Sequence, residues 1–173
     1  MMVTVQGPDS SRDEELIRLM EQYEKELLRL CCVYLKDTQM AMDAVQETFL
    51  KAYRAWNTFQ GKSSEKTWLI RICVNVCKDM RKSAWFRYVD RSVTLDRLPE
   101  PAAPPREDHR AVTEAVMRLP RKYMEAVMLV YYHGLTGREA AEALGITPAA
   151  VSKQLKKAKI LLKDALERGE EHE

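Results

Sequence analysis

No apolar run in this sequence is long enough to cross a bilayer. The longest runs, such as AVMLVYY, are far shorter than the roughly 20 residues that a transmembrane helix requires. The N-terminus also lacks the charged, then apolar, then small-residue pattern of a secretory leader. The sequence therefore predicts a soluble, cytoplasmic protein that is not inserted into a membrane.

Residue types that carry catalysis or hold metal ions are few and scattered. The three histidines lie far apart in the sequence, at His109, His133 and His172. The four cysteines form no CxxC pair and no zinc-site spacing: Cys31, Cys32, Cys73 and Cys77. We therefore expect no catalytic residue, no metal and no cofactor. The cysteines are interpreted as buried thiols in a reducing compartment, and a redox pair is the alternative.

Neither sign of charge dominates the chain. It has 28 lysines and arginines against 26 aspartates and glutamates, which gives a net charge of +2. A chain with so small a net charge attracts nucleic acid only weakly as a whole. Any DNA-binding surface must then be local, and we expect DNA binding to need a partner.

Apolar residues recur at helical spacing through most of the chain. They make up 46% of the 173 residues, which is enough for one domain or two small ones, and their spacing predicts an all-α fold. The pattern stops between Tyr88 and His109, where four prolines favour an extended segment: Pro99, Pro101, Pro104 and Pro105. We predict two small helical domains, residues 1–88 and 110–173, joined by a proline-rich linker at 89–109.

Local signals define the first two helices. Ser11 and Glu14 have the spacing of a capping box, ahead of a helix that ends near Leu35. Asp37 can cap a second helix over Thr38–Trp56. Polar residues on this second helix, including Asp43, Gln46 and Glu47, fall mainly outside its apolar side. A solvated surface is the simplest interpretation of them.

Aromatic and basic residues are interleaved in the next segment. Phe59 stands in the polar loop NTFQGKSS, where it either anchors the loop or contacts a ligand. A third helix over about 64–83 carries Trp68 on its apolar side, and its other side is polar and mostly basic: Lys66, Arg71, Asn75, Lys78, Arg81 and Lys82. Rings that stack on bases beside cations that neutralise phosphates are typical of a single-stranded nucleic acid surface. For Trp68, a place in the core is an equally good interpretation.

The stretch beginning GLTGREAAEALGITP has the pattern of a helix-turn-helix. Thr136 and Glu139 predict a capping box at the start of a short helix. Gly145 supplies the left-handed conformation that commonly ends a helix. Thr147 can cap the next helix, with Pro148 at its first position.

The second helix of this motif is apolar on one side and basic on the other. Its apolar stripe consists of Val151, Leu155, Ala158, Leu161 and Leu162, and its other side carries Ser152, Lys153, Gln154, Lys156, Lys157, Lys159 and Lys163. Such a helix can lie in the major groove of DNA. An ordinary helical hairpin with a solvated lysine face is the alternative.

The order of these features resembles the extracytoplasmic-function sigma factors of bacteria. MDAVQETFLKAYRAW resembles the family's region 2.2 helix and TWLIRICVNVCKDMRK its downstream-promoter helix. The stretch from LPRKYMEAV through ITPAAVSKQLKKAKILL resembles its region 4. The resemblance covers nearly the whole chain and implies a subunit of RNA polymerase that recognises promoters and starts transcription.

The resemblance also implies roles for individual residues. The helix that binds the polymerase core would contribute Asp43, Gln46, Glu47, Phe49 and Tyr53. The non-template strand of the minus-10 element would meet Phe59, Lys66, Trp68, Arg71 and Asn75. The double-stranded minus-35 element would meet Thr147, Ala149, Ser152, Lys153, Lys156 and Lys157. A further partner implied by the family is an anti-sigma factor, which is frequently membrane-bound.

Two other classes of protein fit parts of the pattern. A stand-alone helix-turn-helix regulator would bind an operator without polymerase, but it would need unaided affinity that the small net charge disfavours. A site-specific recombinase would need a catalytic constellation in the first domain, and no nucleophile, base or metal set is recognisable there.

Overall fold

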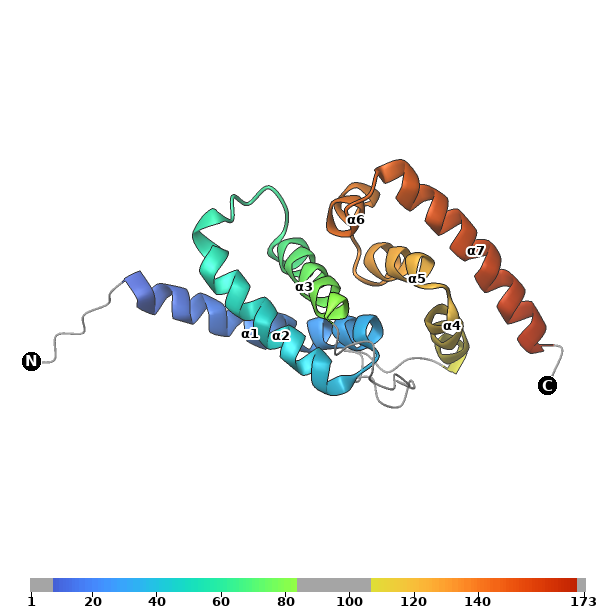
Figure 1. Ribbon diagram of the computed structural model, residues 1–173, viewed down its shortest axis with the longest axis horizontal. Coiled ribbons are helices and arrows are strands. Elements are labelled where there is room, and N and C mark those ends of the chain that lie inside the picture. Colours follow the sequence, from blue (N-terminus) through green and yellow to red (C-terminus); the bar gives the residue numbers. More distant parts are fainter. Residues whose placement is uncertain (1–7, 84–106, 171–173) are drawn as a thin grey trace, which may run out of the picture. The chain divides into compact units, whose positions relative to one another are not determined.

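The computed structural model describes residues 8–83 and 107–170, and within these residues every regular element is a helix (Figure 1). The all-α prediction is therefore confirmed. The chain divides into two compact units, Met1–Arg91 and Ser92–Glu173, and each is described by itself. Most of the predicted linker lies outside the described residues. Its last three positions, 107–109, were expected to be extended but form the first turn of a helix.

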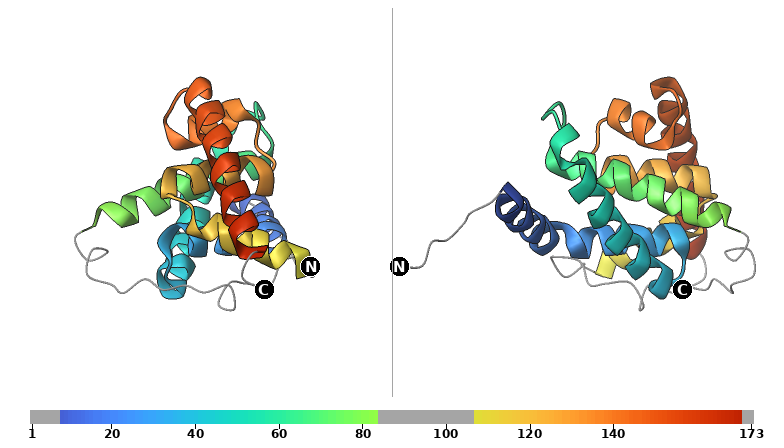
Figure 2. Two further views of the ribbon diagram at one scale, coloured as in Figure 1. Left: turned by 90° about the vertical axis from the view of Figure 1, so that its right-hand side faces the viewer. Right: turned by 60° about the vertical axis from the view of Figure 1, so that its left-hand side comes forward.

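Unit 1 contains three long helices that all pack against one another. They are α1 (Pro8–Leu35), α2 (Thr38–Ala55) and α3 (Glu65–Lys82), and a short 3-10 turn, η1 (Trp56–Thr58), follows α2. Both α2 and α3 lie against α1 (Figures 1 and 2). The largest fully buried side chains of this unit come mainly from α1 and α3: Leu19, Leu27, Leu30, Leu35, Leu69, Ile70, Val74 and Val76.

Side-chain caps fix where α2 and α3 begin. The Oδ1 of Asp37 accepts a hydrogen bond of 2.7 Å from the backbone N–H of Met40. Ser64 does the same for α3, because its Oγ accepts the N–H of Thr67 at 3.1 Å. Each cap satisfies one of the N–H groups that a helix start leaves without an intrahelical partner.

The start of α1 and the buried side of α3 differ from the prediction. α1 begins at Pro8, so Ser11 lies inside the helix and the predicted capping box at Ser11 is wrong. Proline suits a first helical position because its missing N–H would have no partner there. The buried side of α3 is also rotated: Ile70, Val74 and Cys77 are buried, whereas Trp68 is only half-buried.

Within residues 107–170, unit 2 contains five helical elements. They are α4 (Glu107–Arg118), α5 (Arg121–Val127), η4 (Met128–Tyr132), α6 (Gly137–Leu144) and α7 (Pro148–Glu170). The sequence predicts one continuous helix from Pro120 to His133, but its last part, η4, is a π-helix. The backbone N–H of His133 bonds to the carbonyl of Met128 at 2.9 Å, which is the five-residue spacing of that helix type.

The helix-turn-helix forms as the sequence predicts. Thr136 and Glu139 make both bonds of the capping box, with 3.2 Å from the N–H of Glu139 to the Thr136 hydroxyl and 2.9 Å from the N–H of Thr136 to the carboxylate. Gly145 ends α6 with a φ of +71°. The hydroxyl of Thr147 accepts the N–H of Ala150 at 3.1 Å, and α7 begins at Pro148.

Gly145→Ala should lower the free energy of unfolding of unit 2 by about 1 kcal/mol, because a side chain is unfavourable at positive φ. Gly137→Ala is the matched control: Gly137 lies in α6, and an added Cβ would meet no atom within 4 Å at either glycine. We expect the control to leave stability unchanged or raise it. Amide hydrogen exchange of α6 and α7 measures the stability of both variants. Equal protection of these helices in the two variants would contradict the prediction.

Candidate nucleic-acid interface

One side of α7 holds the helix in unit 2. Val151 and Ala158 are fully buried in α7, and Ala140 and Ala141 of α6 are buried with them. α7 packs against α4, α5 and α6. Small side chains at these positions allow the helices of the motif to approach closely, so the orientation of α7 is fixed by packing within the unit.

The opposite side of α7 is exposed and basic. All six residues predicted to meet the minus-35 element are exposed: Thr147, Ala149, Ser152, Lys153, Lys156 and Lys157. Among the described residues, none of Lys153, Lys156 and Lys157 forms an ion pair, whereas Lys163 further along pairs with Glu167 at 3.6 Å. The three lysines therefore keep their positive charges available for phosphates.

In unit 1, three aromatic rings form a cluster where the loop meets α3. The ring of Phe59 lies 5.0 Å from that of Trp68 and 6.1 Å from that of Trp56, and the two tryptophan rings are 5.8 Å apart. Phe59 therefore anchors its loop to α3, which was one of the two alternatives from the sequence. All three side chains remain half-exposed, so the cluster also presents aromatic surface to solvent.

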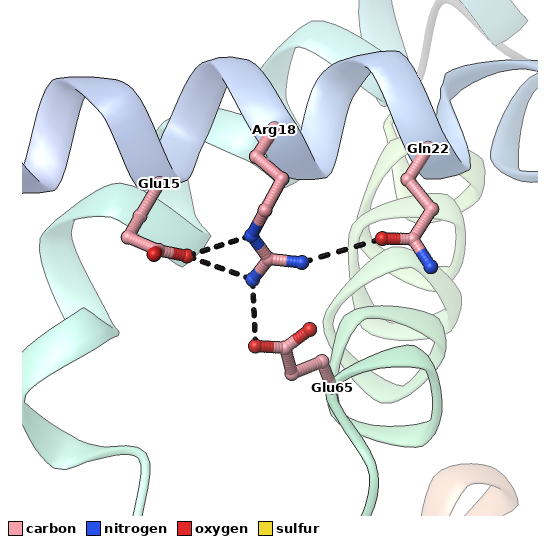
Figure 3. A network of polar contacts seen from close by, with 4 residues as sticks. All are labelled: Glu15, Arg18, Gln22 and Glu65. Carbon is pink, nitrogen blue, oxygen red and sulfur yellow. Dashed lines mark hydrogen bonds and ion pairs between the residues drawn. The ribbon is translucent and has the colours of Figure 1, made fainter.

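Two ion pairs fasten the start of α3 to α1. Arg18 of α1 contacts Glu65 at 2.7 Å, and on its own helix it also binds Glu15 at 2.9 Å and Gln22 at 3.3 Å (Figure 3). The hydrogen bonds to Glu65 and then to Glu15 raise the pKa of Arg18 above its usual value. Because the groups are partly exposed, such pairs each contribute less than about 1 kcal/mol, so their main effect is orientation.

The second pair involves a residue predicted to bind the minus-10 strand. Lys66 Nζ lies 2.7 Å from Glu26 of α1. The ammonium group of Lys66 therefore already has an anionic partner within unit 1. Further along α3, Arg71 is half-buried and Asn75, one helical turn later, is exposed.

The candidate residues of α2 fall into two groups. Asp43 and Gln46 are exposed, and Glu47 is partly exposed with Lys51 at 4.0 Å. Phe49 is only 3% exposed and belongs to the core of unit 1, so the expectation that its side chain meets a partner directly is corrected. Tyr53 is half-buried, and its hydroxyl donates to Asp13 of α1 at 3.0 Å.

The sequence of the chain matches two protein families, Sigma-70 region 2 over residues 19–87 and Sigma-70 region 4 over residues 109–162. The first range begins within α1 and includes all of α2 and α3, and the second runs from α4 into α7. The chain belongs to the sigma-70 family of RNA polymerase sigma factors. It is of the extracytoplasmic-function type, and its function is to direct transcription initiation by RNA polymerase.

Relatives of this sigma factor come from several bacteria. The RNA polymerase sigma-H factor of Pseudomonas aeruginosa is 28% identical over 163 residues, covering 86% of this chain and 84% of the relative. SigW, an extracytoplasmic-function sigma factor of Bacillus subtilis, is 26% identical over 162 residues, covering 86% and 87%. BldN of Streptomyces coelicolor is 31% identical, covering 87% of this chain and 60% of the relative.

Two solved structures have the same fold. RpoE of Bartonella quintana, solved with the anti-sigma factor NepR, has a TM-score of 0.67 and 24% identity, covering 90% of this sigma factor and 96% of that chain. CnrH, solved with the cytosolic domain of CnrY, has a TM-score of 0.65 and 22% identity, covering 90% of each chain. In the described part of this chain, no helix has the length and apolar character needed to traverse a membrane.

Sequence reasoning missed two parts of this site. Trp56 was placed at the end of the second helix and not in the aromatic cluster, although its spacing of three from Phe59 was a usable signal. The contact of Arg18 with Glu65 joins residues 47 positions apart, and no local pattern marks such a pair. Both features position the loop and the start of α3.

Proposed function

We propose that this sigma factor binds the RNA polymerase core through the exposed polar side of α2. Exposed charged and polar side chains are able to form specific contacts with a partner. Asp43 and Gln46 are exposed on this side, beside the partly exposed Glu47. Phe49 and Tyr53 would act indirectly, by packing α2 into unit 1. Because polymerase supplies the chemistry, this function requires no catalytic residue, metal or cofactor of the chain.

In unit 2, we propose that α7 lies in the major groove of the minus-35 element. The observation that carries this assignment is the exposed lysine side of α7, which lies opposite the fully buried Val151 and Ala158. Lysines neutralise phosphates and release counterions, while the N-terminal residues of a recognition helix meet base edges. Thr147, Ala149 and Ser152 lie at that end of α7 and face solvent.

We propose that the aromatic cluster of Trp56, Phe59 and Trp68 receives the unpaired non-template strand of the minus-10 element. Flipping a base out of a duplex costs a few kcal/mol. Stacking on an aromatic ring returns about 1 to 3 kcal/mol per base. The two terms nearly balance, so capture of one or two bases by half-exposed rings is sufficient to hold the strand open. Arg71 and Asn75 on α3 would contact the same strand.

The two units would act as separate domains in this account. We place the start of the minus-35 domain at α4, which begins at Glu107, and not at residue 110. The segment between the units would connect them along the polymerase. This sigma factor would work in the cytoplasm, where polymerase and DNA are found. The complex of RpoE with the anti-sigma factor NepR supports an anti-sigma factor as an additional partner.

A DNA mobility-shift assay distinguishes this function from that of a stand-alone operator-binding regulator. With a net charge of +2, the chain alone should bind promoter DNA weakly. Adding core polymerase should produce a stable, promoter-specific complex. Equally tight and equally specific binding by the chain alone would favour the stand-alone regulator and refute the proposal.

Phe59→Leu should weaken promoter opening by about fivefold or more, because it keeps the apolar packing of the loop but removes the ring on which a base would stack. Phe59→Tyr retains the ring and is the matched control. A 2-aminopurine base in the non-template minus-10 strand reports unstacking in the complete complex with core polymerase. If the leucine and tyrosine variants opened the promoter to the same extent, Phe59 would have no role in strand capture.

A further inference from the structure

Three cysteine thiols that are distant in the sequence meet in the core of unit 1. The Sγ of Cys31 in α1 lies 3.2 Å from that of Cys73 and 3.6 Å from that of Cys77, both in α3. All three sulfur atoms lie within 4.8 Å of one another. Cys73 and Cys77 are four residues apart on one face of α3, as the sequence predicts, and Cys31 approaches them from the neighbouring helix.

This three-thiol cluster has the geometry of a site for a soft metal ion. Three sulfur atoms at about 2.3 Å from a central ion in a planar arrangement stand about 4.0 Å apart. Two of the sulfur separations, 3.2 and 3.6 Å, are slightly shorter than this value, and the third is no more than 4.8 Å, so coordination requires the sulfur atoms to move by less than about 1 Å. Thiolates are soft ligands that favour monovalent copper, zinc and iron–sulfur clusters over hard cations.

The number of ligands in the cluster determines which of these metal ions it suits. Among the described residues, the group contains three cysteines and no histidine or carboxylate. A structural zinc site needs four protein ligands, and a catalytic one needs an open position for water. All three cysteines are 0% exposed, which leaves no such position. Three sulfur donors in a dry core therefore suit a three-coordinate monovalent ion.

We propose that Cys31, Cys73 and Cys77 form a three-coordinate site for monovalent copper that joins α1 to α3. Coordinated thiols lose their protons, so the bound site is anionic. Arg81, one turn after Cys77, supplies positive charge at this interface: its guanidinium carbon lies 5.5 Å from the centre of the Tyr34 ring on α1. None of the three cysteines is among the residues assigned to DNA or polymerase.

Cys32 provides the matched control. It is also 0% exposed and adjoins Cys31 in the sequence, but it does not belong to the cluster. Cys32→Ala thus removes a buried thiol of the same chain without removing a ligand.

The test is a titration of the reduced full-length chain with monovalent copper under anaerobic conditions, in competition with a coloured copper chelator. Because the thiols are buried, copper is added both to the folded chain and during refolding from urea. We expect one copper ion per chain for the wild type and for Cys32→Ala. Cys31→Ala, Cys73→Ala and Cys77→Ala should each weaken binding by about tenfold or more, with helical circular dichroism verifying their folding.

X-ray absorption at the copper edge of the loaded wild-type chain counts the sulfur ligands directly and does not depend on the folding of any variant. Three sulfur neighbours are expected. The site would be overturned by a count of two sulfur neighbours or by nitrogen ligands. It would also be overturned if Cys32→Ala lost as much copper as the three ligand variants do. The copper site would also be overturned if the reduced chain failed to compete for copper under both loading conditions. If Cys31 and Cys73 then formed a disulfide on exposure to air, the cluster would be a redox pair instead.

Discussion

Asp43→Lys should abolish detectable binding of this sigma factor to core polymerase while leaving unit 1 folded. Asp43 is exposed on α2, where its carboxylate accepts a long, exposed hydrogen bond of 3.5 Å from the side-chain amide of Gln39. Substitutions at such positions usually change stability by less than about 0.5 kcal/mol. A reversed charge within a polar interface, in contrast, weakens binding by several kcal/mol, which is a loss of a hundredfold or more.

Glu167→Lys is the control for Asp43→Lys. It makes the same change in net charge on the exposed end of α7, in the other unit of the chain. The apparent affinity for core polymerase is measured by fluorescence anisotropy of the labelled chain, and circular dichroism verifies folding. Glu167→Lys should bind core like the wild type. Binding by folded Asp43→Lys at wild-type affinity would remove the α2 side from the polymerase interface.

Replacing Lys153, Lys156 and Lys157 together by glutamine should reduce initiation at promoters with a minus-35 element by about a hundredfold at physiological salt. Each lysine that contacts a phosphate releases a counterion on binding, which contributes about 0.9 to the slope of the logarithm of affinity against the logarithm of salt concentration. The triple variant should therefore lower that slope by about 2 to 3. The single substitutions Lys156→Gln and Lys157→Gln should each lower it by about 1.

Lys163→Gln is the matched control for the lysine variants. Lys163 lies on the same helix but is already paired with Glu167 at 3.6 Å, so its loss should leave the salt slope unchanged. Promoter affinity of the complete polymerase complex is measured at several salt concentrations. Wild-type strength and slope in the triple variant would show that the lysine side of α7 does not meet DNA.

Local chemistry explains why much of this fold is predictable from the sequence. The cap at Asp37, the capping box of Thr136 and Glu139, and the left-handed Gly145 each act within four residues. Such signals determine helix boundaries directly. The lysine side of α7 follows from helical periodicity alone, because its opposite side is the apolar stripe that packs into unit 2.

Features that depend on tertiary contacts were not predictable in the same way. Helical periodicity predicts that Phe49 faces inward, whereas the family resemblance implies that it lies at the polymerase interface. Its burial agrees with the periodicity. The π-helix at η4 preserves the apolar pattern of an α-helix, so no sequence signal marked it. Cys31 meets Cys73 across 42 positions, which explains why linear spacing gave no ligand set.

Run-off transcription with purified core polymerase tests the central claim most directly: unit 1 recruits polymerase and captures an opened strand, while unit 2 recognises duplex DNA. The templates are promoters upstream of the transcripts that appear when this sigma factor is overproduced. Core polymerase alone should give no specific transcript, and addition of the wild-type chain should start transcription at a defined position downstream of the minus-10 element. Failure of the wild-type chain to confer specific initiation on any of these templates would contradict the account.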